Sequence, residues 1–425
     1  MGLYSIPYGK GSLQFELEDN RLKAVLCPRY SEQIDADQRT IVQKALEHPI
    51  GSKRLRELSK GKGRILVITS DHTRPVPSAI TLPVYLDEIR SENSDAEIII
   101  LVATGLHRSP TKEELREKFT DNIIDNEKIV IHNARDNEHM VFLGELPSGG
   151  ELWLNDLVKW ADLIVAEGFI EPHFFAGYSG GRKSVLPGIA SKVTILYNHN
   201  STFIKNVRSV QGSINENPIH LDMVYASQQA NLAFILNVLL DSRKRIVVAV
   251  AGDPIDAHLA GCAICENHTR AAPVLADIVI TSNGGYPLDQ NVYQAVKGMT
   301  AAEACVREGG VIIMCAALGD GHGGEEFYHW FTKRDSAAAV LREIESIQAE
   351  MTTQDQWQAQ ILARVLNKAR CIFVTGEENR DIIEGMHMKW ASDIKAALAL
   401  TSEIVGKNAS VIIIPDGVNI IISSS

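Results

Sequence analysis

The sequence predicts an α/β protein with two doubly wound domains, mostly parallel sheets and a functional site in the cleft between them. Short apolar runs alternate with amphipathic stretches along almost the whole chain, which is the pattern of strands joined by helices. These runs are continuous in Ile, Val and Leu, as expected for strands covered on both faces. The length of 425 residues corresponds to two or three domains at roughly 150 residues each.

The first series of elements predicts an N-terminal domain over residues 1–270. Helices are expected at 78–92, 111–119 and 256–270. The apolar runs that we expect to form its strands are 64–70, 97–104, 128–134, 139–146, 163–169, 232–240 and 245–252.

A second series predicts a C-terminal α/β domain over residues 275–405. Its strands are expected after Ala276, Gly309 and Cys371, and its helices begin near Asn291, Ser336 and Asp355. The last apolar strand, which follows Ser410, fits either sheet, and we expect the segment 406–425 to pack back on the first domain.

Composition excludes several classes of protein. The chain has 42 basic and 53 acidic residues, a net charge of −11, which argues against general binding to nucleic acid or to acidic membranes. No apolar run approaches the roughly 18 residues of a membrane helix, and the first residues lack the apolar core of a signal peptide. We therefore expect a cytoplasmic location, with reduced cysteines and a structural role for Cys262 and Cys265.

Polar residues that could take part in binding or catalysis follow the expected strands. In open α/β sheets, ligands bind beyond the carboxyl ends of the strands. Asp71 and Arg74 follow the first of these strands, where they suit a capped turn or a carboxylate site. His107 and His173 follow two others; each alone fits a loop histidine, but a pair of bases from two strand ends suits the two faces of one carbon.

The glycine-rich segment from Gly177 resembles a phosphate loop but departs from it. The motif G-x-x-x-x-G-K-[ST] requires glycine at position 182, where Arg182 stands. The amides of Gly180 and Gly181, with Arg182 and Ser184, still suit an anion. Arg182 and these amides should also lower the pKa of Lys183, and a neutral lysine is a nucleophile.

Three further groups are ambiguous when each is taken alone. His199 cannot hold a transition metal without other ligands, and alone it suits a helix surface. Gln294 and Lys297 share one helix face, either as an ordinary first turn or as a carboxylate site across the cleft. The glycine-rich loop from Gly319 to Gly324 is expected in the cleft wall, or forms only a tight turn.

Taken together, five motifs resemble the nickel-pincer lactate racemase family. The resemblance runs from the first strand to Gly417, and its long central motif is highly specific. The motifs are Ser70-DHTRPVPS, Ala103-TGLHR, Glu167-GFIEPHFFAGYSGGRKSVLPGIAS, Asn283-GGYPLDQNVYQAVKGMTAAEA and Asp320-GHGGE.

The resemblance implies a cofactor and a set of roles. The family's cofactor is a pyridinium-3-thioamide-5-thiocarboxylic acid mononucleotide bearing nickel. A thioamide links it to the lysine that matches Lys183, and the histidine that matches His199 is a nickel ligand. The paired bases match His107 and His173, and the other site residues match Asp71, Arg74, Gln294, Lys297, Tyr293 and Trp357.

The function that this resemblance implies is the interconversion of D- and L-lactate. The cofactor would take hydride from a 2-hydroxy acid and return it to either face of the keto acid, while histidines exchange the hydroxyl proton. Cofactor-maturation proteins are expected partners. The alternatives are a racemase or epimerase of another 2-hydroxy acid such as malate, or a nucleotide- or phosphate-binding protein that uses the glycine-rich loop.

Overall fold

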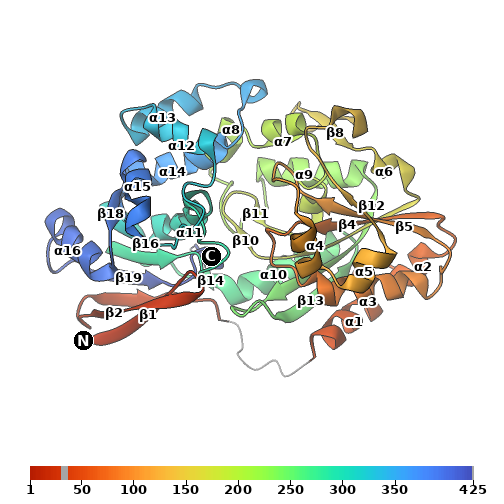
Figure 1. The fold of residues 1–425 in the computed structure, drawn as a ribbon, viewed down its shortest axis with the longest axis horizontal. Helices are drawn as coiled ribbons and strands as arrows, with labels where there is room; N and C mark the ends of the chain where they lie inside the picture. The colour runs from red at the N-terminus through yellow and green to blue at the C-terminus, as the bar shows by residue number, and fades with distance from the viewer. Residues whose placement is uncertain (30–36, 424–425) are drawn as a thin grey trace.

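The computed structural model describes residues 1–29 and 37–423, which form two α/β units (Figure 1). The first unit is built on a sheet in which β13 runs antiparallel to β12 and the other strands are parallel. In spatial order its strands are β13 (Ile246–Gly252), β12 (Leu232–Leu240), β9 (Leu163–Phe169), β4 (Arg64–Ser70), β5 (Glu97–Ala103) and β6 (Lys128–Ile131).

Both faces of this sheet are covered, which explains the continuous apolar runs. Side chains alternate between faces along a strand. Ile65 and Val67 of β4 pack on one face in a cluster with α1 (Gln38–Glu47) and α3 (Ser78–Arg90). Leu66 and Ile68 pack on the other face, in a cluster that includes residues of α7 (Lys192–Asn198) and α9 (Pro218–Gln229).

The second unit has an all-parallel sheet. β15 and β16 lie at its centre, flanked by helices and by a hairpin, as the buried clusters on its two faces show. In spatial order its strands are β18 (Lys389–Ala391), β17 (Arg370–Val374), β16 (Val306–Cys315), β15 (Ala276–Ser282), β19 (Val411–Ile414) and β3 (Leu22–Val25). The predicted α/β class with mostly parallel sheets is therefore confirmed.

The strand pairing departs from the expected domain boundaries at both ends of the chain. β3 lies beside β19 in the second sheet, although residues 1–270 were expected to form one domain. β19 pairs with β15 and β3, and its fully buried side chains enter the apolar clusters on both faces of the second sheet. Only the end of the chain turns back: Ile421 packs with Ile170 and Tyr178 of the first unit.

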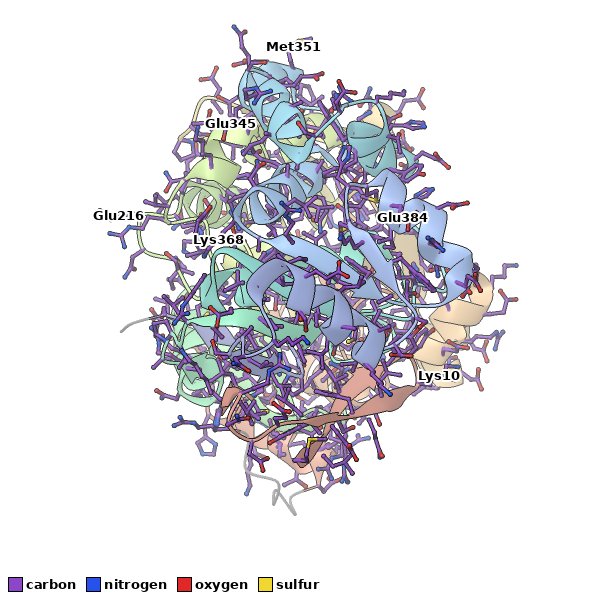
Figure 2. The ribbon with its side chains drawn as sticks, turned by 90° about the vertical axis from the view of Figure 1, so that its left-hand side faces the viewer. Lys10, Glu216, Glu345, Met351, Lys368 and Glu384 are labelled. Carbon is purple, nitrogen blue, oxygen red and sulfur yellow. The ribbon has the colours of Figure 1, made fainter. Side chains whose placement is uncertain are left out.

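Small two-stranded sheets and the helices complete the fold. The N-terminal hairpin covers one face of the second sheet, while charged side chains such as Lys10 and Glu384 are exposed (Figure 2). The paired strands are β1 (Gly2–Tyr8) with β2 (Gly11–Leu17), β7 (Met140–Glu145) with β8 (Glu151–Asn155), β10 (Pro172–His173) with β11 (Gly177–Tyr178), and β14 (Arg270–Ala271) with β20 (Ile421–Ile422).

None of the helices in the described part of the chain is long and apolar enough to cross a membrane. The remaining helices are α2 (Leu55–Ser59), α4 (Lys112–Lys118), α5 (Asp121–Asn126), α6 (Leu157–Trp160), α7 (Lys192–Asn198), α8 (Ser201–Lys205), α9 (Pro218–Gln229), α10 (Asp256–Thr269), α11 (Val292–Cys305), α12 (Glu325–Thr332), α13 (Ala337–Glu345), α14 (Gln356–Lys368), α15 (Arg380–Gly385) and α16 (Ile394–Val405).

Candidate active site

A cavity of about 690 Å³ is lined by residues of both units. It lies where β4, β5 and β9 end, as the rule for open sheets predicts. The structure brings to it twelve of the residues singled out in the sequence: Asp71, Arg74, His107, His173, Gly180, Lys183, Ser184, His199, Tyr293, Gln294, Lys297 and Trp357.

Asp71 and His107 form a hydrogen-bonded pair on the first-unit wall. His107 Nδ1 lies 2.7 Å from Asp71 Oδ2, and Asp71 is only 1% exposed. Burial alone would raise the pKa of Asp71, but the hydrogen bond and charge of His107 hold it well below its usual range. Asp71 is therefore a carboxylate that accepts a proton-bearing Nδ1, which leaves Nε2 of His107 available for a substrate.

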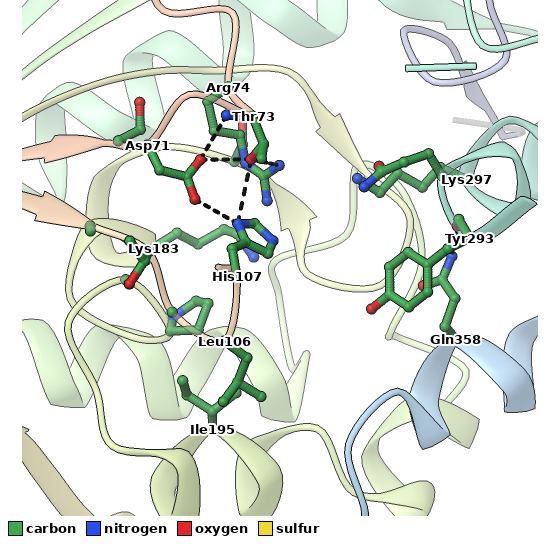
Figure 3. A pocket seen from close by; sticks show the side chains of 18 of the residues that line it. Asp71, Thr73, Arg74, Leu106, His107, Lys183, Ile195, Tyr293, Lys297 and Gln358 are labelled. Carbon is green, nitrogen blue, oxygen red and sulfur yellow. Dashed lines mark hydrogen bonds and ion pairs between the residues drawn. The ribbon is translucent and has the colours of Figure 1, made fainter. Parts of the chain in front are cut away.

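Thr73 and Arg74 extend this pair (Figure 3). The amide and the hydroxyl of Thr73 donate to Asp71 Oδ1 at 3.0 and 2.6 Å. Arg74 Nη1 donates in turn to the Thr73 hydroxyl at 3.0 Å. Side-chain hydrogen bonds thus hold the loop after β4 together, and they fix the position from which Arg74 reaches the cavity.

His173 lines the same cavity from the short strand β10. Its Nδ1 accepts a hydrogen bond from the Ala176 amide at 3.3 Å. Burial and then the charge of Lys183 hold the pKa of His173 well below its usual range, so the ring is neutral.

Lys183 lies in the glycine-rich loop, which the structure shows as a 3₁₀ turn, Gly181–Ser184. Gly180 has φ of +76°, and a Cβ atom there would lie 2.5 Å from Asn237 Oδ1, so the tight turn requires glycine. The expected lowering of the Lys183 pKa is confirmed in direction, but burial is its largest cause and the charge of Arg182 comes second. Burial therefore favours the uncharged form of the amine, which lines the cavity.

Arg182 and Gly181 are not among the described residues that line the cavity, although we expected both at a bound anion. The guanidinium of Arg182 is 3% exposed and donates to the carbonyls of Ala176 at 2.8 Å and Gly180 at 3.2 Å. The Gly181 amide donates to Asn237 Oδ1 at 2.8 Å. Arg182 is occupied by carbonyls of the loop and the Gly181 amide by a side chain of β12, because the left-handed turn exposes main-chain atoms that need partners.

His199 is buried, not on a helix surface as its isolated position suggested. It follows α7, is 5% exposed, and its ring lies edge-on between Phe175 and Trp357, each with its centroid 5.1 Å away. Burial and then the charge of Lys183 lower its pKa to about 3. A neutral imidazole is the form that binds a metal.

The second unit forms the opposite wall. The Asn291 side chain caps α11, which places Tyr293, Gln294 and Lys297 in its first turns at the cavity (Figure 3). Burial lowers the pKa of Lys297 to about 7. Trp357 Nε1 donates to the Tyr293 hydroxyl at 3.1 Å, so α14 supports the aromatic part of this wall.

Comparison with known proteins identifies the family. Family models described as the lactate racemase N-terminal domain and the lactate racemase C-terminal domain match residues 8–212 and 271–422. The chain is 52% identical over 423 residues to the lactate racemase of Thermoanaerobacterium thermosaccharolyticum, covering 99% of each chain. The chain belongs to the lactate racemase family. It is also 47% identical to the lactate racemase of Lactiplantibacillus plantarum over 420 residues, covering 98% of this chain and 99% of that one.

The fold of this lactate racemase family member agrees with solved structures. The apoprotein of the lactate racemase from T. thermosaccharolyticum matches with a TM-score of 0.96 at 51% identity, covering 100% of both chains. A Thermotoga maritima protein matches with a TM-score of 0.64 at 19% identity, covering 91% of this chain and 98% of that one, which shows a shared fold alone.

The cavity of this family member fits a ligand larger than a small hydroxy acid. Its volume falls in the range, roughly 300–1,000 Å³, of pockets that hold drug-sized ligands. Buried polar atoms in its wall lack partners among the described residues, namely Ser70 Oγ, His72 Nδ1, His199 Nδ1, Gln294 Oε1 and Gln358 Oε1. Buried polar groups are normally hydrogen-bonded, so these atoms favour a polar ligand.

The protein's own donors do not make a metal site. Among residues 1–29 and 37–423, no three His, Cys, Asp or Glu side chains are grouped to hold a metal ion. A metal at His199 would therefore need its other ligands from a bound organic group. Cys262 and Cys265 are buried thiols of α10, and burial raises the pKa of Cys262 to about 12, in keeping with a structural role.

The cavity residues that were not predicted as site residues include Thr73, Asp355 and Gln358. Thr73 stands two residues after Asp71, and this Asp-x-Thr spacing could have indicated the turn. Asp355 has a left-handed φ of +65° at the start of α14, and burial raises its pKa to about 6. Neither property of Asp355 has a sequence signal, because both depend on the packing of the second unit.

Proposed function

We propose that the protein interconverts D- and L-lactate by hydride transfer to and from a nickel-pincer nucleotide tethered to Lys183. One observation carries this proposal. A buried lysine with a lowered pKa, a lone buried histidine and a carboxylate-supported histidine converge on one large cavity, in a chain that resembles named lactate racemases over its full length.

Two residues would hold the cofactor. Burial lowers the pKa of Lys183 and so favours the neutral amine, the form needed for a covalent bond to a thioacid carbon. His199 offers a neutral imidazole clamped by two aromatic rings. When bound, the cofactor supplies an acceptor and a donor of hydride.

The remaining residues handle the substrate. Arg74 and Lys297 approach from opposite units, and either can hold the carboxylate of a 2-hydroxy acid. His107 and His173 exchange the hydroxyl proton; Asp71 stabilises the positive charge that His107 acquires when it accepts one. Phe174, Phe175 and Trp357 are largely buried in the cavity wall, which limits access of water.

The decisive experiment compares Lys183→Ala with Lys112→Ala, a control at an exposed lysine. Each variant is produced with cofactor-maturation proteins, and we measure intact mass, nickel content and racemisation of lactate by chiral chromatography. We expect an adduct, nickel and activity in the wild type and in Lys112→Ala, and loss of adduct and activity in Lys183→Ala.

Undiminished racemisation by Lys183→Ala would overturn the covalent assignment. A loaded wild-type protein that racemises malate but not lactate would instead show that the substrate is another 2-hydroxy acid. Activity on neither acid, with no adduct, would refute the proposed function.

A further inference from the structure

The hairpin that carries His173 fixes the position of one hydrogen on its ring. β10 and β11 pair antiparallel, with His173 opposite Gly177, and the intervening turn brings the amide of Ala176 back to the ring. This amide donates to His173 Nδ1 at 3.3 Å. A nitrogen that accepts a hydrogen bond carries no hydrogen of its own.

The ring has little freedom to leave this arrangement. Its centroid lies 4.9 Å from that of Phe174 and 4.5 Å from that of Phe175. The carbonyl of Ala176 accepts from the buried Arg182 at 2.8 Å, which holds the turn from its other side. Because the ring is also neutral, its single hydrogen lies on Nε2.

His107 has the opposite arrangement. Its Nδ1 faces Asp71 Oδ2 at 2.7 Å, and a carboxylate can only accept, so a hydrogen of the His107 ring lies on Nδ1. In the tautomer that this contact selects, the lone pair of His107 lies on Nε2. The two histidines therefore enter a reaction in different states, although their residue type is the same.

We propose that the substrate-free enzyme holds His107 and His173 in opposite tautomers, so that His107 accepts the hydroxyl proton while the Nε2–H group of His173 donates a hydrogen bond, with the Ala176 amide as the positioning group. This inference rests on the proposed function, because the cofactor proposed there is the acceptor of the hydride. The hydroxyl proton moves to Nε2 of His107, and the hydrogen on Nδ1 stays in the bond to Asp71. The α-hydrogen leaves with its electron pair to the cofactor, and a neutral C=O bond remains.

The consequence is an asymmetry between the enantiomers. The enantiomer whose hydroxyl meets His107 is oxidised without rearrangement of the site. The enantiomer whose hydroxyl meets His173 first requires that this ring move its hydrogen from Nε2 to Nδ1, which breaks the bond from Ala176. When the first enantiomer is oxidised with His107 as the base, His173 instead presents its Nε2–H group to the new carbonyl oxygen.

Nitrogen NMR of the ¹⁵N-histidine-labelled, substrate-free protein tests the tautomers without any assay of activity. The chain has 13 histidines, and the signals of the two are assigned by their loss in His107→Gln and His173→Gln. We expect a protonated Nδ1 in His107 and a protonated Nε2 in His173. The same tautomer in both rings, or a protonated Nδ1 in His173, would overturn the proposal whether or not the enzyme racemises lactate.

A single-turnover assay of the loaded variants tests the roles. Glutamine can donate a hydrogen bond as Nε2–H does but cannot take up a proton. We expect His173→Gln to oxidise one enantiomer to keto acid at nearly the wild-type rate, and His107→Gln to lose that reaction by about 10²–10⁴-fold. Equal losses in both variants for both enantiomers would refute the unequal roles, whereas a wild type that oxidises neither enantiomer would refute the proposed function itself.

Discussion

Replacing Asp71 with asparagine should reverse the tautomer of His107. Asp71 Oδ1 accepts two hydrogen bonds from Thr73, at 3.0 Å from the amide and 2.6 Å from the hydroxyl. In Asp71→Asn this position must keep the amide oxygen, because both Thr73 groups donate. The NH₂ group is then directed at His107 Nδ1, which must accept, so the hydrogen of His107 moves to Nε2. The Nε2 atom then has no lone pair with which to accept a proton from the substrate.

The size of the effect follows from the loss of a base. General base catalysis contributes about 10²–10⁴-fold, or roughly 3–5 kcal/mol at about 1.36 kcal/mol per decade. In a Ser-His-Asp triad the equivalent substitution lowers kcat by about 10⁴-fold through the wrong tautomer. We therefore expect Asp71→Asn to lower racemisation by about 10²–10⁴-fold while the fold is retained, since the side chain keeps its shape and its bonds to Thr73.

The assay is racemisation of lactate by the loaded enzyme, with ¹⁵N NMR of His107 alongside. Asp136→Asn is the matched control, because Asp136 Oδ2 lies 2.9 Å from His139 Nδ1 in an exposed pair and neither residue is among those that line the cavity. The control should keep wild-type activity. Asp71→Asn with activity within a few-fold of the wild type, or with the hydrogen of His107 still on Nδ1, would refute this reasoning.

Three further predictions follow from the cavity. His199→Ala should lose nickel but keep the organic adduct in intact-mass analysis; full nickel occupancy would show that the metal is held elsewhere. Lys297, with a pKa of about 7, is charged below that pH and neutral above it, so KM for lactate should rise by up to about tenfold per pH unit above pH 7. Lys297→Arg should flatten that rise, and a wild-type KM that is constant over this range would contradict the role. Gly180→Ala should lower Tm more than Gly61→Ala, because φ is +76° and +73° at the two sites but only the Cβ at 180 meets Asn237, at 2.5 Å; equal losses would show that the clash is relieved.

The sequence was sufficient for the elements whose signal is local. Continuous apolar runs such as 65–68 indicated strands covered on both faces, because neighbouring side chains of such a strand enter two different cores. The positions of Asp71, His107 and His173 after strands were sufficient to predict that they share one edge of the sheet, and all three line the cavity. Strand β19 was ambiguous because an all-apolar strand fits any buried position, and only pairing with β15 and β3 places it in the second sheet.

What the sequence by itself determined was the fold class, the family and twelve of the residues that meet at the cavity. Only the tertiary structure decided the state of each residue. Arg182 and Lys183 are adjacent cations in the sequence, yet one bonds to main-chain carbonyls and the other faces the cavity, where burial lowers its pKa. The protonated nitrogen of His107 depends on Asp71, 36 residues away, and that of His173 on a turn that only the hairpin closes. Protonation and hydrogen-bond direction are set by burial and by neighbours distant along the chain, which residue type and spacing do not encode.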